Sequence, residues 1–131
     1  MVTETDIQSM IRVAAANRHS ALWRNNNGAC RDDTGRMIRY GLGNDSKKLN
    51  EVWKSSDLIG ITPVMIGPEH VGRVIGVFTA VEVKRESWRK PENKRDRAQE
   101  AFLADVLRYG GIAMFANSVE AYQAGGVRYG S

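Results

Sequence analysis

The fold depends on one stretch of the sequence, RVIGVFTAVEVK at residues 73–84. After Arg73 its residues are apolar or small until the end, where Glu82 and Lys84 appear. β-Branched residues dominate it, so we expect a strand, and apolar residues on both faces are typical of a strand in the middle of a sheet. Because side chains alternate along a strand, Glu82 and Lys84 are predicted to share one face, opposite Val81 and Val83.

Two charged side chains at the end of an apolar strand need partners, since an unpaired carboxylate is costly to bury. One interpretation is structural, with Glu82 and Lys84 forming a plain ion pair at the strand edge. The other involves Asp57, at the start of a second predicted strand, 57–66. If this strand pairs with 73–84 as an antiparallel hairpin, Asp57 approaches Glu82. Two ionised carboxylates repel unless a cation lies between them, and Mg²⁺ accepts one or two carboxylates together with phosphate oxygens.

Length and composition indicate an ordinary folded domain. The 131 residues suffice for one domain with a hydrophobic core, and 42% of them are hydrophobic and 26% charged. No apolar run approaches the roughly 18 residues that a spanning helix needs, so we expect no membrane association. The acidic start lacks the basic and apolar regions of a signal peptide, and the single cysteine, Cys30, cannot form an intramolecular disulfide. We therefore expect a cytoplasmic protein.

Positive charge is concentrated in one segment, residues 84–97, which we call the basic segment. It holds seven Lys and Arg residues against three Asp and Glu residues, a local net charge of +4. The whole chain also carries +4, so the other residues balance to zero. A confined basic patch is what a polyanion-binding surface requires, because phosphate contacts release condensed counterions. The alternative is a solvated loop and helix face.

The remaining periodicities predict helices and strands in alternation, with Gly110-Gly111 as a left-handed helix cap and a loose tail from Gly125. Strands 22–24 and 36–40 are expected to form a hairpin. A mixed β-sheet flanked by helices, in a single α/β domain, is the packing that this order favours. The predicted helices are 5–18, 46–54, 92–109 and 118–123, and the predicted strands are 22–24, 36–40, 57–66, 73–84 and 112–115.

Asp57, followed by Glu82-Val83-Lys84, resembles the pattern of the PD-(D/E)XK nucleases. The surrounding motifs resemble, in their order, the virus-type replication-repair (VRR-Nuc) nucleases of that superfamily. Ser56 stands where the superfamily pattern has proline, a residue that carries no chemistry. The motifs are Leu22-Trp23-Arg24-Asn25-Asn26-Asn27-Gly28, Ser56-Asp57-Leu58-Ile59-Gly60, Gln99-x-x-Phe102 and Gly110-Gly111-Ile112-Ala113, within roughly residues 3 to 122.

The resemblance implies a restriction-endonuclease-like core over residues 1–124, followed by a flexible tail over 125–131. It also implies a site for Mg²⁺ or Mn²⁺. Asp57 and Glu82 would bind the ion, with the Val83 carbonyl and Glu4 as further ligands. Lys84 would be the catalytic lysine, and Gln99 would face it from the following helix. Glu4 fits equally well as an acid that complements a helix dipole, and Gln99 as a surface amide.

The function that the resemblance implies is metal-dependent hydrolysis of DNA, selective for Holliday junctions or other branched DNA. A homodimer would supply two sites for paired cuts. Phage origin and action in the bacterial cytoplasm are expected. The segment 43–55 is longer than a minimal domain of this family needs, and one interpretation is that it shapes DNA access. The alternative is a non-catalytic nucleic-acid-binding module with a structural Asp/Glu/Lys network. The expected backbone contacts are Arg85, Arg89, Lys90, Lys94, Arg24 and Asn26, although Asn25–Asn27 also read as turn formers and Trp88 as either a core residue or a DNA contact.

Overall fold

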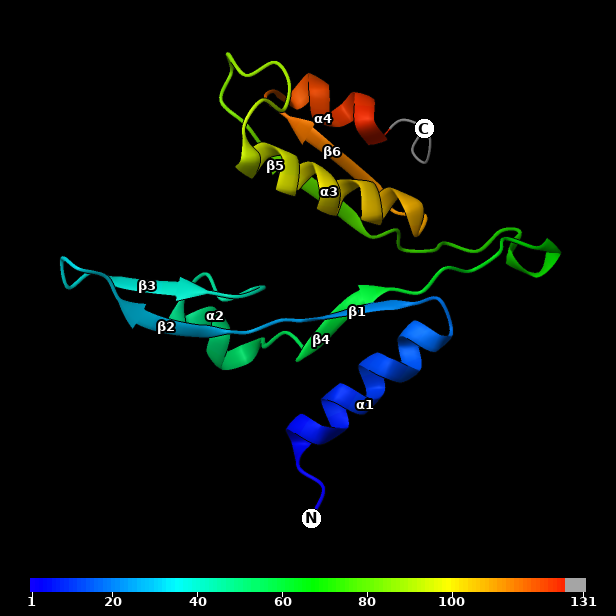
Figure 1. The fold of residues 1–131 in the computed structure, drawn as a ribbon, viewed down its shortest axis with the longest axis horizontal. Helices are drawn as coiled ribbons and strands as arrows, with labels where there is room; N and C mark the ends of the chain where they lie inside the picture. The colour runs from blue at the N-terminus through cyan, green and yellow to red at the C-terminus, as the bar shows by residue number, and fades with distance from the viewer. Residues whose placement is uncertain (127–131) are drawn as a thin grey trace. The chain divides into compact units, whose positions relative to one another are not determined.

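The computed structural model describes residues 1–126, which form two compact units, Met1–Gly60 and the chain from Ile61 onward (Figure 1). Within these residues lie four α-helices and six short strands, so the mixed α/β class is confirmed. The strands pair in three two-stranded sheets, β1–β4, β2–β3 and β5–β6. The elements are α1 (Glu4–Asn17), β1 (Ala21–Arg24), β2 (Gly28–Arg31), β3 (Met37–Tyr40), α2 (Lys47–Val52), β4 (Leu58–Ile61), the 3₁₀ turn η1 (Pro68–His70), β5 (Thr79–Val83), α3 (Lys94–Arg108), β6 (Ile112–Ala116) and α4 (Val119–Gly126).

Helix α1 confirms the first predicted helix and begins at a capping box. The Thr3 hydroxyl accepts from the Asp6 backbone N–H at 3.1 Å, and the Asp6 carboxylate accepts from the Thr3 N–H at 3.0 Å. Ile7, Met10, Ile11 and Ala14 form an apolar stripe at helical spacing, but α1 has no buried residue, and Met10 is 63% exposed. The two-stranded sheets of the first unit are too small to cover this stripe.

The predicted hairpin between 22–24 and 36–40 is wrong in its first strand. Strand β3 pairs antiparallel with β2, from Gly28↔Tyr40 to Arg31↔Met37, across the turn at residues 32–36. The Asp32 carboxylate organises this turn by accepting from the backbone N–H groups of Thr34 and Arg36, and Gly35 supplies a φ of +83°. The sequence Asp32-Asp33-Thr34-Gly35 indicates a turn here. The strand before it, Gly28–Arg31, does not alternate between apolar and polar residues, so its sequence does not indicate a strand.

Strand β1 pairs with β4 instead. The Asn25 N–H donates to the Asp57 carbonyl at 2.8 Å, and Gly60 lies against the Ala21 carbonyl, so the two strands run antiparallel. The second predicted strand, 57–66, is shortened to β4 because Pro63 has no N–H for a ladder. Asp57 therefore lies directly before β4.

In the second unit β5 and β6 run parallel, with Thr79 beside Ile112 and Val83 beside Ala116. The predicted strand 73–84 is shortened to 79–83, because β6 offers only five residues as a partner. The expectation that both faces are buried is also wrong, since Val83 is 75% exposed.

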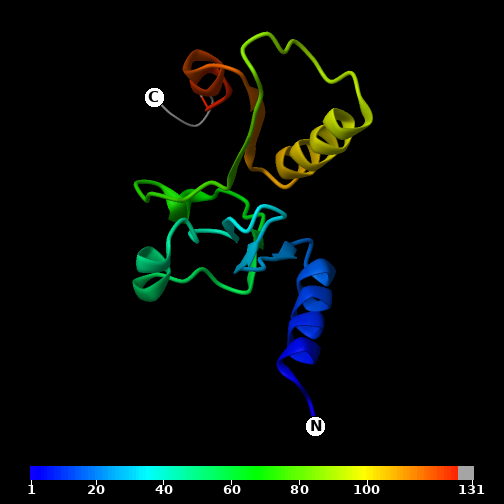
Figure 2. The same cartoon turned by 90° about the vertical axis from the view of Figure 1, so that its left-hand side faces the viewer.

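The core of the second unit lies where α3 packs on this sheet. Leu103, Val106, Ile112 and Ala116 are buried, and Val106 is fully inaccessible. Helices α3 and α4 lie on opposite faces of the β5–β6 pair (Figure 2). Gly125 and Gly126 close α4, and the rest of the predicted tail, 127–131, lies outside the described residues.

The predicted glycine cap of α3 is confirmed as a Schellman motif. The Gly111 N–H donates to the Val106 carbonyl and the Gly110 N–H to the Leu107 carbonyl, while Gly110 has a φ of +94°. The chain then enters β6 at once, because the Ile112 N–H donates to the Phe78 carbonyl at 2.9 Å. Among the described helices, none is long and apolar enough to cross a membrane.

We expect Gly111→Ala to destabilise the second unit. A Cβ at this position would lie 2.7 Å from Val106 Cγ1 and 2.8 Å from the Phe78 carbonyl oxygen, which is fixed backbone. Overpacking of this kind costs about 1–3 kcal/mol in free energy of unfolding, measurable by urea denaturation. Gly76→Ala is the matched control, because a Cβ there meets open space. Equal midpoints for the two variants would contradict the close approach.

Candidate active site around Glu82 and Lys84

The alternation of β5 places Glu82 and Lys84 on one face, as predicted. Glu82 is registered beside Phe115 of β6, and the Lys84 N–H continues the pairing by donating to the Ala116 carbonyl. Helix α3 packs over this sheet, and side chains from its first two turns reach Glu82 and Lys84. Both side chains are partly shielded from solvent, and Lys84 is only 13% exposed.

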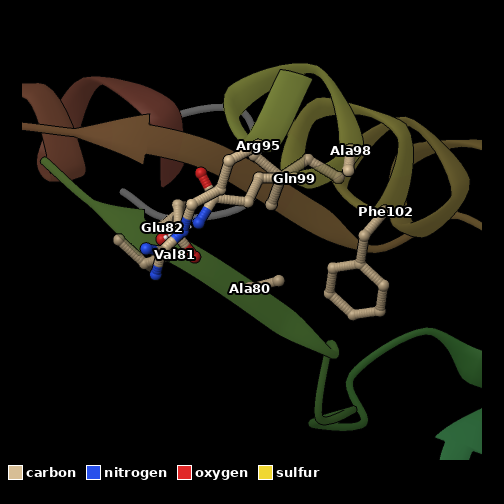
Figure 3. Close-up of a pocket in the computed structure, with 8 residues that line it drawn as sticks. Ala80, Val81, Glu82, Arg95, Ala98, Gln99 and Phe102 are labelled. Atoms are coloured by element: carbon tan, nitrogen blue, oxygen red, sulfur yellow. Dashed lines mark hydrogen bonds between the residues drawn. The ribbon is translucent and has the colours of Figure 1, made fainter. Parts of the chain in front are cut away.

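Gln99 connects the two charged residues. Its Nε2 donates to Glu82 Oε1 at 2.7 Å, and its Oε1 accepts from Lys84 Nζ at 2.6 Å. An amide is suited to this position because it offers a donor at one end and an acceptor at the other. The predicted inward position of Gln99 on the helix is therefore observed, and Figure 3 shows its side chain reaching from α3 toward Glu82.

The direct partner of Lys84 is Asp96, not Glu82. Lys84 Nζ lies 2.7 Å from Asp96 Oδ1, and the Asp96 side chain is 8% exposed. Trp88 Nε1 donates to the other carboxylate oxygen at 3.1 Å. The hydrogen bond from the Lys84 ammonium, and then that from the Trp88 indole, hold the pKa of Asp96 below its ordinary value of 3.8, so it is ionised at neutral pH.

The sequence interpretation does not single out Asp96, which is one of the three acids of the basic segment. A signal was available, because Asp96 and Gln99 are three residues apart and therefore share a face of α3. The plain Glu82–Lys84 ion pair of the structural interpretation is replaced by a chain of contacts running from Glu82 through Gln99 and Lys84 to Asp96.

Trp88 completes this network as a half-buried residue. Its ring packs on Phe115 with centroids 4.6 Å apart, and Lys84 Nζ lies 5.8 Å from the indole centroid. The Asn117 side chain fixes the loop by donating to the backbone carbonyls of Glu86 and Trp88. These contacts fit the core interpretation of Trp88 better than a base-stacking role.

A groove of about 400 Å³ opens between β5 and α3 beside this network (Figure 3). Its polar end holds Glu82 and Gln99, and its other end holds Phe102. Within the described residues Glu82 Oε2 has no hydrogen bond, and no buried side-chain oxygen or nitrogen lacks one, so Oε2 is open to solvent. The lining residues are Ala80, Val81, Glu82, Arg95, Ala98, Gln99, Phe102 and Leu103.

Asp57 belongs to the first unit, where its side chain is exposed. Asn25 and Asn27 build its surroundings, because both side-chain amides donate to Ser55 Oγ, at 2.7 and 2.8 Å. Asn26, the residue we predicted to contact DNA, is exposed between them. These two asparagines fix the chain just before Asp57 through contacts across the fold, and the turn predicted at residues 25–27 is not observed.

The other predicted residues divide between the two units. Glu4 is exposed in the first turn of α1, where it complements the helix dipole, and Arg24 is exposed at the end of β1. Arg85, Arg89, Lys90 and Lys94 are exposed in the loop after β5 and at the start of α3.

The structure therefore brings together Glu82, Val83, Lys84 and Gln99 within one unit. The antiparallel hairpin that we used to bring Asp57 to Glu82 is not among the strand pairings of residues 1–126. No three His, Cys, Asp or Glu side chains in that range gather as a metal-binding cluster. A shared metal site of Asp57 and Glu82 remains a prediction.

Comparison with known proteins adds no relative. No family model matches the chain, and searches among curated proteins and among solved structures find no match either.

We expect Asp96→Asn to lower the melting temperature at pH 7 by about 5 °C or more, because it removes the charge that Lys84 is buried against. The folded-state pKa of Asp96 is depressed, so its contribution to stability is present above 3.8 and disappears as the pH falls through the lower folded value. The difference between wild type and variant should accordingly narrow below pH 3.8, as followed by circular dichroism.

Asp105→Asn is the matched control on the same helix. Asp105 pairs with Arg108 at 3.0 Å, but its side chain is 56% exposed, and exposed ion pairs contribute little. A melting temperature shift in Asp96→Asn no larger than that of Asp105→Asn would show that the buried pair does not stabilise this unit.

Proposed function

We propose that the protein is a divalent-metal-dependent DNA endonuclease with a restriction-endonuclease-like core. The observation that carries the proposal is Gln99, which holds Glu82 and Lys84 at fixed positions on one face of β5. A carboxylate and an ammonium joined through one amide suit phosphodiester hydrolysis, where one group binds a cation and the other meets negative charge. The resemblance of the Asp57 and Glu82-Val83-Lys84 motifs to VRR-Nuc nucleases supports the same reaction.

The donor set fits a hard divalent cation. Glu82 Oε2 is open to solvent while Oε1 is held by Gln99, so the carboxylate is oriented but keeps one oxygen available. Asp57, the Val83 carbonyl and Glu4 are the other groups that we propose to hold Mg²⁺ or Mn²⁺. Such an ion supplies Lewis-acid polarisation of the phosphate and lowers the pKa of a water molecule.

Lys84 is oriented for a role at the phosphate. Two of its three N–H groups are taken by Asp96 and Gln99, which leaves one for a phosphate oxygen. In the reaction, a water oxygen forms a bond to phosphorus, the bond from phosphorus to one sugar oxygen breaks, and that leaving oxygen takes up a proton. Lys84 would stabilise the charge that develops on the non-bridging oxygens.

The substrate and assembly follow from the same proposal. Arg85, Arg89, Lys90 and Lys94 are exposed next to the Lys84 network, where they would bind the DNA backbone. Because one chain supplies one site, paired cuts in a branched substrate such as a Holliday junction call for a homodimer. We propose action in the cytoplasm, of a bacterial host if the protein is phage-encoded.

One observation favours the second candidate, a nucleic-acid-binding module without catalysis. Lys84 is already neutralised by Asp96, and no buried side-chain polar atom in the described residues lacks a partner, as in a purely structural network. In that case Glu82 and Asp57 would bind no metal, and the basic segment alone would carry the function.

The first experiment compares cleavage by wild type and Glu82→Gln. We expect wild type to nick branched DNA with Mg²⁺ or Mn²⁺ but not with EDTA, and Glu82→Gln to cut at least about 100-fold more slowly with unchanged DNA binding. Lys84 is left intact, because its removal would leave the buried Asp96 carboxylate without its cationic partner.

Glu86→Gln provides the matched control, since Glu86 is an exposed carboxylate two residues after Lys84. It should cut at the wild-type rate. Binding without cleavage on branched and linear DNA, with either metal, would favour the binding module instead.

The second experiment tests whether Asp57 and Glu82 hold one ion. We expect Asp57→Asn and Glu82→Gln each to weaken Mn²⁺ binding at least about tenfold, as measured by electron paramagnetic resonance of free Mn²⁺. If the two carboxylates share a site, the double variant should bind no more weakly than the worse single variant. Strictly additive losses, or no loss for Asp57→Asn, would mean that the two side chains do not meet at one metal.

A further inference from the structure

A second groove, of about 430 Å³, lies wholly within the first unit beside Asp57. Unlike the groove between β5 and α3, it is lined mainly by amide, hydroxyl and charged groups, and its only apolar side chain is that of Ala29. One wall comes from the segment 43–55, for which the sequence predicts no specific contact. The lining residues are Asn27, Gly28, Ala29, Arg39, Asn44, Asn50, Lys54, Ser55 and Asp57.

Arg39 is held rigidly at this groove by a buried side chain. Asn44 is 4% exposed, and its Oδ1 accepts from Arg39 Nε at 3.1 Å and from Nη2 at 2.7 Å. The Asn44 Nδ2 donates in turn to the carbonyls of Gly28 and Tyr40, at 2.8 Å each. One edge of the guanidinium is thus fixed, while Nη1 has no hydrogen bond among the described residues. An arginine ordered in advance loses less entropy when it binds an anion.

Lys54 brings a second cation to the same groove. It follows α2, and its Nζ donates to Asn50 Oδ1 at 2.6 Å. The wall between Lys54 and Asp57 is fixed by Ser55, whose hydroxyl donates to the Leu42 carbonyl and accepts from two asparagine amides. The positions of the cations are therefore set by local hydrogen bonds.

The chemistry of the groove favours an anion with several acceptor oxygens. Two cations outnumber the one carboxylate, Asp57, and the amides of Asn27 and Asn50 add neutral donors. Planar guanidinium and flexible ammonium groups together are typical of phosphate recognition. An apolar ligand would find almost no apolar wall.

We propose that this groove is a phosphate subsite, in which Arg39 and Lys54 hold the backbone of a polynucleotide strand next to Asp57. The inference rests on the proposed function only in taking a nucleic-acid strand as the ligand. It gives the segment 43–55 a defined role, since α2 and the residues after it carry Lys54 and Asn50 to the groove.

The test measures binding in EDTA, so that it does not depend on cleavage. A fluorescein-labelled DNA duplex is titrated with wild type, Lys54→Ala and Lys47→Ala at several salt concentrations. Lys47 is the matched control, because it is an exposed lysine of α2 that does not line the groove. We expect Lys54→Ala to weaken binding about threefold to tenfold and to reduce the slope of log K against log salt by about 1, and Lys47→Ala to change neither. Arg39→Lys keeps the positive charge but loses the paired N–H groups of the guanidinium. It should therefore weaken binding with little change in the slope of log K against log salt.

Equal effects of Lys54→Ala and Lys47→Ala on affinity and slope would overturn the inference. A second arm titrates a nucleoside monophosphate. If Lys54→Ala weakens the mononucleotide but not the duplex, the ligand is a free phosphorylated compound and the polynucleotide assignment is wrong. The failure of the proposed function is a separate outcome. Wild type that never cuts DNA can still show a salt dependence of binding that is sensitive to Lys54, and an active nuclease can lack that sensitivity.

Discussion

The buried contact between Lys84 and Asp96 is the interaction on which the second unit and its candidate site depend. It joins the end of β5 to the first turn of α3, and it does so with both side chains largely withdrawn from water. An ion pair in such a place holds only if further hydrogen bonds satisfy its remaining atoms, and here Gln99 and Trp88 supply them. The position of Glu82 follows from this arrangement, because Gln99 links it to Lys84.

Lys84 therefore has two roles. It ties α3 to the sheet, and in the proposed reaction it also meets a phosphate oxygen. A lysine that only contacted phosphate would be mobile, and ordering its long side chain would cost conformational entropy at each turnover. Because Asp96 and Gln99 already order it, the cost of placing its remaining donor is met during folding rather than during binding.

Local patterns predicted much of this molecule, and long-range pairing was where prediction failed. The first helix, the glycine cap of α3 and the shared face of Glu82 and Lys84 follow from residues close together in sequence, and all three are observed. The pairing of β1 with β4 and the extent of β5 depend on which distant strand lies alongside, which alternation alone does not specify. For Asp96 the three-residue spacing from Gln99 indicates a shared helix face, but only the packing of α3 on the sheet shows that this face meets Lys84.

The Schellman motif at the end of α3 also determines how the helix is oriented on the β5–β6 pair. Gly110 and Gly111 leave no slack between the helix and β6, because the Ile112 N–H is bonded to the Phe78 carbonyl immediately after the cap. The rotational phase of α3 is therefore locked to the register of the parallel pair. A slip of one residue would turn Asp96 and Gln99 about 100° around the helix axis, away from Lys84 and Glu82. Gly110 and Gly111 lie at the other end of α3 from the charged cluster, yet they fix the rotation of the helix that keeps Asp96 and Gln99 facing the strand.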